Sequence, residues 1–157
     1  MELEVVCREK VKKMLSFIAL LALLTAAACS RHPVYPEPVR TASEVEIGMK
    51  ALTEGSPQFF TYHFQDKDIN FFVIKTGGKV LSFFDACAKC YPKKLGYRID
   101  NGYIVCKSCN VRYSVAEIEK GIGSCFPIQI PGQLDGNIQD GKYRIAVAEL
   151  EKAAYRF

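Results

Sequence analysis

The sequence predicts a mainly β protein, built as a small antiparallel β domain with one or two short helices. Three observations lead to this prediction. The chain of 157 residues contains eight tyrosines and ten phenylalanines but no tryptophan, and many of these aromatic residues gather in short runs that favour strands. Turn signals rich in glycine, asparagine and aspartate separate the runs. Two motifs of paired cysteines follow such runs, which is typical of loops that bind metal.

The strands are expected where apolar and aromatic residues dominate short segments. The first three of these are residues 59–64, 69–75 and 80–84. The Gly77-Gly78 pair predicts a hairpin between the second and the third. A further hairpin is expected where Asn101-Gly102 separates residues 97–99 from residues 103–105.

The C-terminal part is expected to contain the helices. Ser114 and Glu117 form a capping-box pattern, which predicts a short helix that ends near Lys120. The remaining predicted elements are closing strands at 128–130 and 142–147 and a terminal helix within 148–157.

The N-terminus has the pattern of an export signal. Residues 15–28 are apolar, Lys12 and Lys13 precede them, and the segment has the length of a signal-peptide core rather than a membrane span. Small residues stand directly before Cys29, as in bacterial lipoproteins. Residues 1–28 are therefore predicted to be a cleaved signal peptide, with Cys29 as the lipid-attachment site. Cleavage by ordinary signal peptidase and an uncleaved membrane anchor are the alternatives.

The domain boundaries follow from composition. Residues 1–13 contain three glutamates where a signal peptide is normally basic, so translation is predicted to start later, at Val11 or Met14. Residues 29–43 are rich in proline and are predicted to be an extended tether. Residues 44–157 are predicted to form the folded metal-binding domain. The protein is expected on the bacterial cell envelope, anchored to a membrane and facing the periplasm or the exterior.

The charge pattern excludes nucleic acid as a partner, because the net charge is only +4 and no basic block is interleaved with aromatic residues. The expected partners are a membrane, through the lipid, and a redox or metal-transport protein. His32 and His63 are the only histidines, so a metal site must use sulfur or oxygen ligands.

Four cysteines are the predicted metal ligands. Cys87 and Cys90 form one C-x2-C motif, and Cys106 and Cys109 form another after an interval of fifteen residues. Two tight turns that each direct two sulfurs toward one point make a tetrahedral four-thiolate site. Structural disulfides are one alternative, since exported cysteines usually oxidise. A thiol-disulfide oxidoreductase is another, although neither motif opens an evident helix. Cys125 is either a buried cysteine without a partner or part of a loop that covers the metal, as a spare ligand or a neighbour of the ligands.

The residues around these cysteines resemble the FtrD-like family of membrane iron–sulfur proteins. The resemblance is carried by residues 84–92, 96–98, 103–109 and 123–127. It implies an iron–sulfur or mononuclear iron centre and a role as electron acceptor beside ferrous-iron uptake systems. A looser resemblance concerns architecture: two metal-binding loops, a third loop with glycine and proline, and closing strands are similar to the Rieske layout. Rieske loops mix cysteine and histidine, whereas all four predicted ligands here are cysteines. Rubredoxin-like or zinc-ribbon-like loops fit the same spacing.

The sequence thus predicts a metal-binding protein that transfers electrons, linked to metal uptake or respiration, rather than an enzyme, and no catalytic residue is predicted. A zinc-stabilised interaction module without a redox role is the alternative. No twin-arginine pair precedes the apolar segment, which favours zinc or a single iron loaded outside the cytoplasm over a prebuilt cluster.

Overall fold

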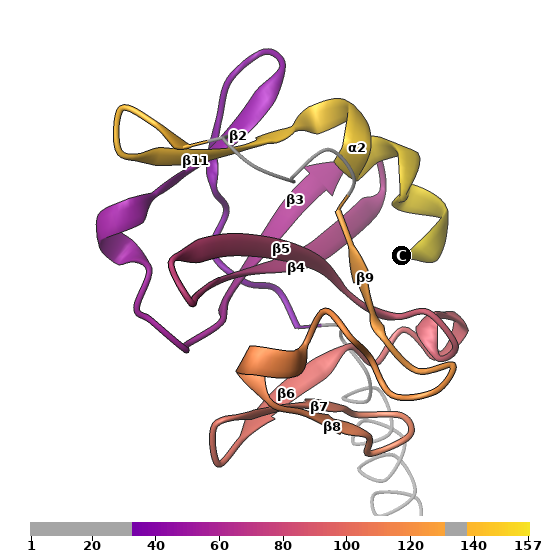
Figure 1. The fold of residues 1–157 in the computed structure, drawn as a ribbon. Helices are drawn as coiled ribbons and strands as arrows, with labels where there is room; N and C mark the ends of the chain where they lie inside the picture. Colours follow the sequence, from indigo (N-terminus) through magenta and orange to yellow (C-terminus); the bar gives the residue numbers. More distant parts are fainter. Residues whose placement is uncertain (1–32, 131–137) are drawn as a thin grey trace, which may run out of the picture. The chain divides into compact units, whose positions relative to one another are not determined.

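The computed structural model describes residues 33–130 and 138–157. The predicted signal peptide, residues 1–28, and the predicted lipid-attachment residue Cys29 lie outside the described residues. The body of the protein comprises Val34–Phe157. It is mainly β, with antiparallel sheets and short helical segments, which confirms the predicted fold class (Figure 1).

The strands form three sheets. Sheet A contains β1 (Val39–Arg40), β2 (Glu44–Gly48), β10 (Ile138–Gln139) and β11 (Lys142–Ala146). Sheet B contains β3 (Gln58–Phe64), β4 (Lys67–Thr76), β5 (Lys79–Cys87) and β9 (Pro127–Gln129). Sheet C contains β6 (Tyr97–Asp100), β7 (Tyr103–Cys106) and β8 (Arg112–Tyr113). Their strand orders are β1-β2-β11-β10, β3-β4-β5-β9 and β6-β7-β8. The helical segments are α2 (Val147–Lys152) and the 3-10 turns η2 (Met49–Ala51), η3 (Tyr91–Lys93), η4 (Val115–Glu117) and η5 (Ala154–Arg156).

Sheet B is the middle layer of the body, because its central strands are buried on both faces. Phe71 of β4 belongs to one hydrophobic core and Phe72 to the other. In β5, Phe84 belongs to the first core and Phe83 to the second. Successive side chains of a strand point to opposite faces, so a strand between two cores must be apolar at every position. This requirement explains the unbroken apolar runs of β4 and β5.

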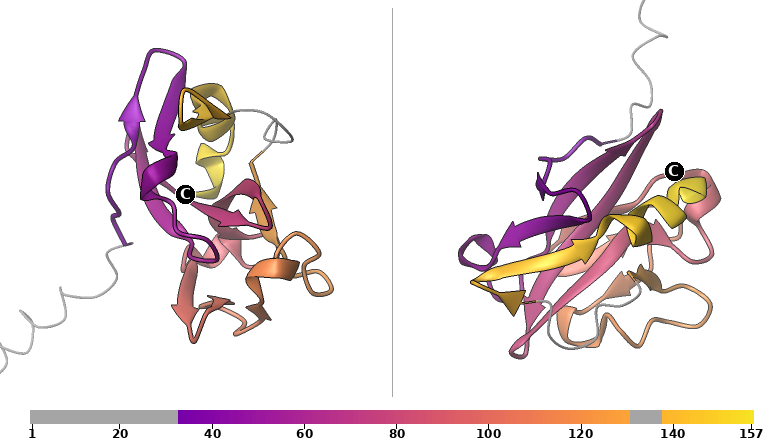
Figure 2. Two further views of the ribbon diagram at one scale, coloured as in Figure 1. Left: turned by 60° about the vertical axis from the view of Figure 1, so that its left-hand side comes forward. Right: turned by 90° about the horizontal axis from the view of Figure 1, so that it is seen from above.

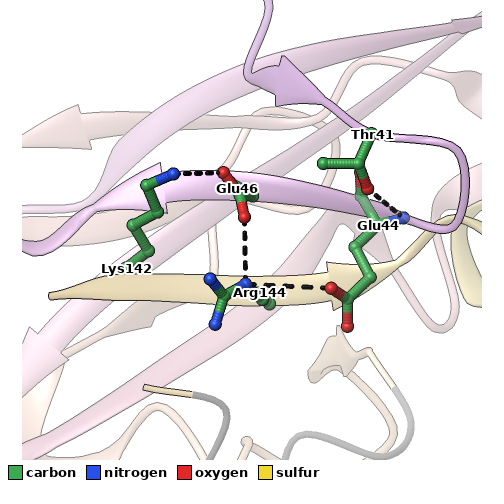
Figure 3. Close-up of polar contacts among 5 residues, drawn as sticks. All are labelled: Thr41, Glu44, Glu46, Lys142 and Arg144. Carbon is green, nitrogen blue, oxygen red and sulfur yellow. Dashed lines mark hydrogen bonds and ion pairs between the residues drawn. The ribbon is translucent and has the colours of Figure 1, made fainter. Parts of the chain in front are cut away.

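The first core lies between sheet B and a layer formed by sheet A and α2 (Figures 1 and 2). Val45 of β2, Ile145 of β11 and Leu150 of α2 are completely buried in it. The pairing of β2 with β11 is also supported by charge: the Glu46 carboxylate accepts hydrogen bonds from Lys142 at 2.6 Å and from Arg144 at 3.0 Å (Figure 3). These two bonds lower the pKa of Glu46. These contacts hold β11, the last strand, to β2.

The second core lies between sheet B and the small sheet C, and it contains cysteine side chains. Ile104 of β7 and Ile118 are almost completely buried there. Cys87, Cys106 and Cys125 are also buried members of this core. These three thiols are therefore built into a hydrophobic core.

The helices only partly match the predictions. The terminal helix is confirmed as α2 followed by η5. The helix predicted from Ser114 to about Lys120 is wrong, because only the single turn η4 forms there. The Ser114 hydroxyl donates to the Glu117 carboxylate at 3.1 Å and makes no bond to the backbone of the turn. Without that cap, the first amides of a longer helix lack a side-chain partner.

Residues 34–43 of the predicted tether are part of the body and contact its other elements. The Tyr35 amide donates to the Thr61 hydroxyl at 2.7 Å, and the Thr61 amide donates to the Pro36 carbonyl at 3.2 Å. The Tyr35 hydroxyl lies 3.4 Å from the carboxylate of Asp85 in β5. This segment therefore reaches the strand that leads into the first cysteine pair.

Candidate metal centre

The first cysteine pair occupies a tight turn at the end of β5. Cys87 is the last residue of this strand and is 3% exposed. The Cys90 amide donates to the Cys87 carbonyl at 3.0 Å, and η3 begins at the next residue. This turn reverses the chain and directs both sulfurs to the same side.

The second pair occupies the turn between β7 and β8. Cys106 ends β7 and is 1% exposed, whereas Cys109 is exposed. The turn is closed by two bonds: Asn110 donates its amide to the Cys106 carbonyl at 2.9 Å, and the Cys106 amide donates to the Val111 carbonyl at 3.0 Å. Asn110 adopts the left-handed conformation, which asparagine tolerates better than most residues.

A third loop carries Cys125. Ile122 and Cys125 exchange two backbone hydrogen bonds, of 2.8 Å and 3.0 Å, which close a small turn between them. The carbonyl of Phe126 accepts a bond of 3.0 Å from the amide of Ala88, in the first cysteine turn. Strand β9 then pairs with the end of β5 beside Cys87. The Cys125 sulfur is brought to the first pair by these long-range bonds.

Four sulfurs converge at this place. Those of Cys87, Cys90, Cys109 and Cys125 all lie within 4.8 Å of one another. The sulfurs of Cys109 and Cys125 are 3.8 Å apart. Three of the four predicted ligands are thus brought together, and Cys125 completes the group. The sulfur of Cys106 is not part of this group but lies beside Cys109. Its role as a ligand stays a prediction.

The thiols perturb one another strongly. Burial raises the pKa of Cys106 to about 12, against the opposing effect of the Cys109 and Ser108 amides and with a smaller contribution from the Cys109 thiol. Burial and Cys109 also raise the pKa of Cys125 to about 11. Burial acts in the same direction on Cys109, but the Val111 amide and the surrounding thiols outweigh it and lower the pKa. The neighbouring groups therefore stabilise one thiolate, at Cys109. Several thiolates at this place would repel one another unless a cation were bound between them.

Two buried tyrosine hydroxyls face the sulfurs. Among the described residues, the hydroxyls of Tyr97 and Tyr113 have no nitrogen or oxygen partner, and the group beside the Tyr97 hydroxyl is the Cys87 thiol. The pKa of Tyr97 is raised well above its ordinary value by burial and then by Cys87, and that of Tyr113 by burial and then by several of the cysteines. A buried donor without a partner is costly. Thiolates bound to a metal would accept hydrogen bonds from these two hydroxyls. The two tyrosines therefore fit a metal centre at the sulfurs.

Asp85 joins the two cysteine-bearing regions. Its carboxylate is 5% exposed and accepts the backbone amide of Tyr97, at the start of sheet C, at 2.6 Å. Burial raises the pKa of Asp85 to about 6, against the opposing effects of the Tyr97 amide and Lys107. Gly96 makes the contact possible: a Cβ atom there would lie 2.6 Å from the carboxylate carbon. The strand that leads to Cys87 is thereby fixed to the hairpin that leads to Cys109.

Sequence reasoning left the role of Cys125 open and missed Asp85. The position of Cys125 depends on the register between β5 and β9, which no local pattern reveals. The sequence does contain an indication of the role of Asp85, because this residue is an acid at the end of an apolar run, directly before a C-x2-C motif. Such a residue is buried with its strand and needs specific donors.

An antiparallel β fold in which three loops bring four thiols together defines a protein with a thiolate-type metal site. The model of a family described as "Membrane iron-sulfur containing protein FtrD-like" matches residues 52–157. The chain belongs to this FtrD-like family. No curated protein and no solved structure matches the chain. Four thiol donors suit the metal in the family description, and they suit zinc equally well.

The family description places its members at a membrane. Within residues 33–130 and 138–157, no helix is long and apolar enough to cross a membrane.

Proposed function

We propose that this protein is an electron carrier of the bacterial cell envelope that uses iron bound to its cysteine thiolates. The observation that carries the proposal is the convergence of four sulfurs from three loops within 4.8 Å. Iron in an all-thiolate site supplies one-electron chemistry, with a potential set by hydrogen bonds to the sulfurs and by solvent exposure. The chain's own residues hold the sulfurs in place and keep one edge of the site accessible.

The accessible edge lies at Cys109. Cys87 and Cys125 are buried, Cys90 is partly buried and Cys109 is exposed. The group therefore runs from the second core to the surface. An electron carrier needs such an edge, because a partner must approach the centre closely, whereas the buried side protects the thiolates from solvent.

The surface beside the site supports a partner protein with an acidic face. Exposed lysines stand in the first cysteine loop at Lys89, Lys93 and Lys94. Lys107, in the second loop, donates its backbone amide to the Gly96 carbonyl at 3.0 Å, which places it next to the first loop. Positive charge around an electron-transfer edge steers an acidic partner and speeds its association. A partner in metal uptake or respiration would use this contact, and a lipid on Cys29 would keep both proteins at one membrane.

A structural zinc site is the second candidate, and one observation favours it. The four converging cysteines come from the end of sheet B, from a turn of sheet C and from the loop before β9. A zinc ion on these residues would add a direct link between sheet B, sheet C and the loop before β9, and closed four-cysteine sites often have this role. Such a site would stabilise an interaction module without transferring electrons.

The visible spectrum of the full protein, purified anaerobically from membranes, tests the proposal together with metal analysis. We expect bound iron and charge-transfer bands that bleach when dithionite is added and return on oxidation. A colourless protein with one zinc per chain would contradict electron transfer and support the structural module. A metal-free protein whose disulfides exchange with a dithiol would instead indicate a thiol-disulfide oxidoreductase.

Replacing Tyr97 by phenylalanine is expected to lower the reduction potential of the iron-loaded protein by about 20–60 mV, the equivalent of one hydrogen bond. The Tyr97 hydroxyl lies beside Cys87, and a donor to a thiolate stabilises the more negative, reduced state. The metal-free protein should lose little stability, because the group beside this hydroxyl is then a neutral thiol, which is a weak acceptor. Redox titration and denaturation of both forms measure the two effects.

Tyr143→Phe is the matched control. The hydroxyl of Tyr143 is hydrogen-bonded to Ser82 at 3.0 Å, and its side chain lies in the first core. This variant should lose stability in both forms and keep its potential. Equal potentials for the Tyr97 variant and the wild type would show that Tyr97 makes no bond to a thiolate.

A further inference from the structure

We infer that this centre is a single tetrahedral metal ion bound by Cys87, Cys90, Cys109 and Cys125, with Cys106 as an adjacent thiol that does not bind the metal. The inference rests on the metal binding in the proposed function but not on its redox role. It differs from the iron–sulfur cluster in the family description and from the ligand set that the two C-x2-C motifs suggest.

The sulfur spacing is that of one ion. Four sulfurs placed about 2.3 Å from a metal at tetrahedral angles are about 3.8 Å apart. The sulfurs of Cys109 and Cys125, which come from different loops, are 3.8 Å apart. The remaining pairs lie within 4.8 Å, so a small closing movement of the side chains completes the tetrahedron.

A cluster does not fit the same positions. In an iron–sulfur cluster the cysteines bind different irons, and inorganic sulfides occupy the space between them. Sulfurs on opposite sides of a cluster are therefore much farther apart than sulfurs on one ion. All pairs in this group are close, and the space they enclose is that of one metal ion. Room for a cluster would require the loops to move apart.

The backbone resists such a movement. The Cys125 loop is tied to the first cysteine turn by the bond from Ala88 to Phe126, of 3.0 Å. The second cysteine turn is tied to the segment after the first by the bond from Lys107 to Gly96, also of 3.0 Å. The first of these bonds joins two sulfur-bearing regions directly, and the second joins the third region to the segment that follows the first cysteine turn. Separating the sulfurs would break them inside a packed body.

Cys106 occupies a different position from the four. It is 1% exposed and belongs to the second core, beside Cys109 but outside the converging group. Cys125, by contrast, lies next to both Cys109 and Cys87. A buried cysteine that binds no metal behaves as a small apolar residue and contributes packing.

A pair of serine variants separates the two ligand sets. Added Co²⁺ is expected to colour the wild-type protein intensely, because four thiolates bind it in a tetrahedron. The Cys125→Ser variant should bind Co²⁺ about a hundredfold more weakly, or weaker still. Cys106→Ser is the matched control and should keep one ion per chain with an unchanged Co²⁺ spectrum. The reverse result, with metal retained by Cys125→Ser and lost by Cys106→Ser, would overturn the inference.

Two measurements on the unaltered full-length protein remain decisive if a variant fails to fold. X-ray absorption at the edge of the native metal should show four sulfur neighbours at about 2.3 Å and no second metal nearby. Analysis for acid-labile sulfide should find none. Sulfide in amounts similar to iron would disprove the single ion and leave electron transfer intact. Zinc without sulfide would support the single ion and disprove electron transfer.

Discussion

Replacing Gly96 by alanine is expected to destabilise the protein by about 2–4 kcal/mol, the sum of backbone strain and overpacking. Gly96 has φ +67°, a conformation that alanine adopts only with strain. The added methyl group would also meet the Asp85 carboxylate, which is buried and would have to give up its hydrogen bond from the Tyr97 amide to withdraw. Chemical denaturation of both proteins in the same metal state measures the difference in the free energy of unfolding.

The variant should also bind metal more weakly. Gly96 and Asp85 fix the hairpin of sheet C to the end of β5, so a displaced carboxylate moves Cys109 away from Cys87. Gly102→Ala is the matched control. Gly102 has φ +78° but nothing within 4 Å of an added Cβ, so this variant carries backbone strain alone. Equal losses of stability and affinity in the two variants would show that the contact with Asp85 has no special role.

Local patterns predicted the strands of sheet B and the first hairpin of sheet C well. A strand between two cores is apolar along its length, and Gly77-Gly78 and Asn101-Gly102 mark hairpins through their positive φ angles. The C-x2-C spacing likewise predicted where each cysteine turn forms. These features depend on neighbours in the sequence, which is why the sequence alone reveals them.

Features that depend on distant residues were harder to predict. Strand β2 pairs with β11, although Glu46 and Lys142 are 96 residues apart. The same holds for Cys125, whose place beside Cys87 follows from the pairing of β9 with β5. Tyr35 belongs to a proline-rich segment that looks like a solvated tether, yet it contacts Thr61 and Asp85. In each case the determining interaction is a long-range backbone or side-chain contact that leaves no periodic pattern.

The helix that the capping-box pattern predicted does not form, and the reason is different. Ser114 and Glu117 have the required spacing, but the serine hydroxyl bonds to the glutamate side chain. The sequence pattern cannot distinguish this bond from a bond to the backbone. Ile118 is nevertheless buried in the second core, so packing rather than capping decides the conformation of this segment.

Removing the metal is expected to loosen one half of the body and leave the other intact. Among the residues that the structure describes, the second core has eleven buried members, three of them cysteines, whereas the first core has sixteen buried members and no cysteine. Sheet C consists of strands of two to four residues, too short to be stable alone. The metal would add four further bonds between sheet C, the Cys125 loop and sheet B.

Hydrogen exchange of the full protein, loaded and after chelation under reducing conditions, measures this difference by region. Amides of β7 and of residues 115–126 should lose protection by roughly a hundredfold or more, because a ligand present well above its Kd stabilises whatever it holds by a few kcal/mol. Amides of β2 and β11 should stay protected, since sheet A and the first core do not include the site. Restoring the metal should restore protection, which distinguishes metal loss from damage by the chelator. Equal loss of protection in both cores would mean that the body unfolds as one unit. Unchanged protection in both cores would mean that the metal adds nothing to the stability of the body, and that the fold alone holds the cysteines in place.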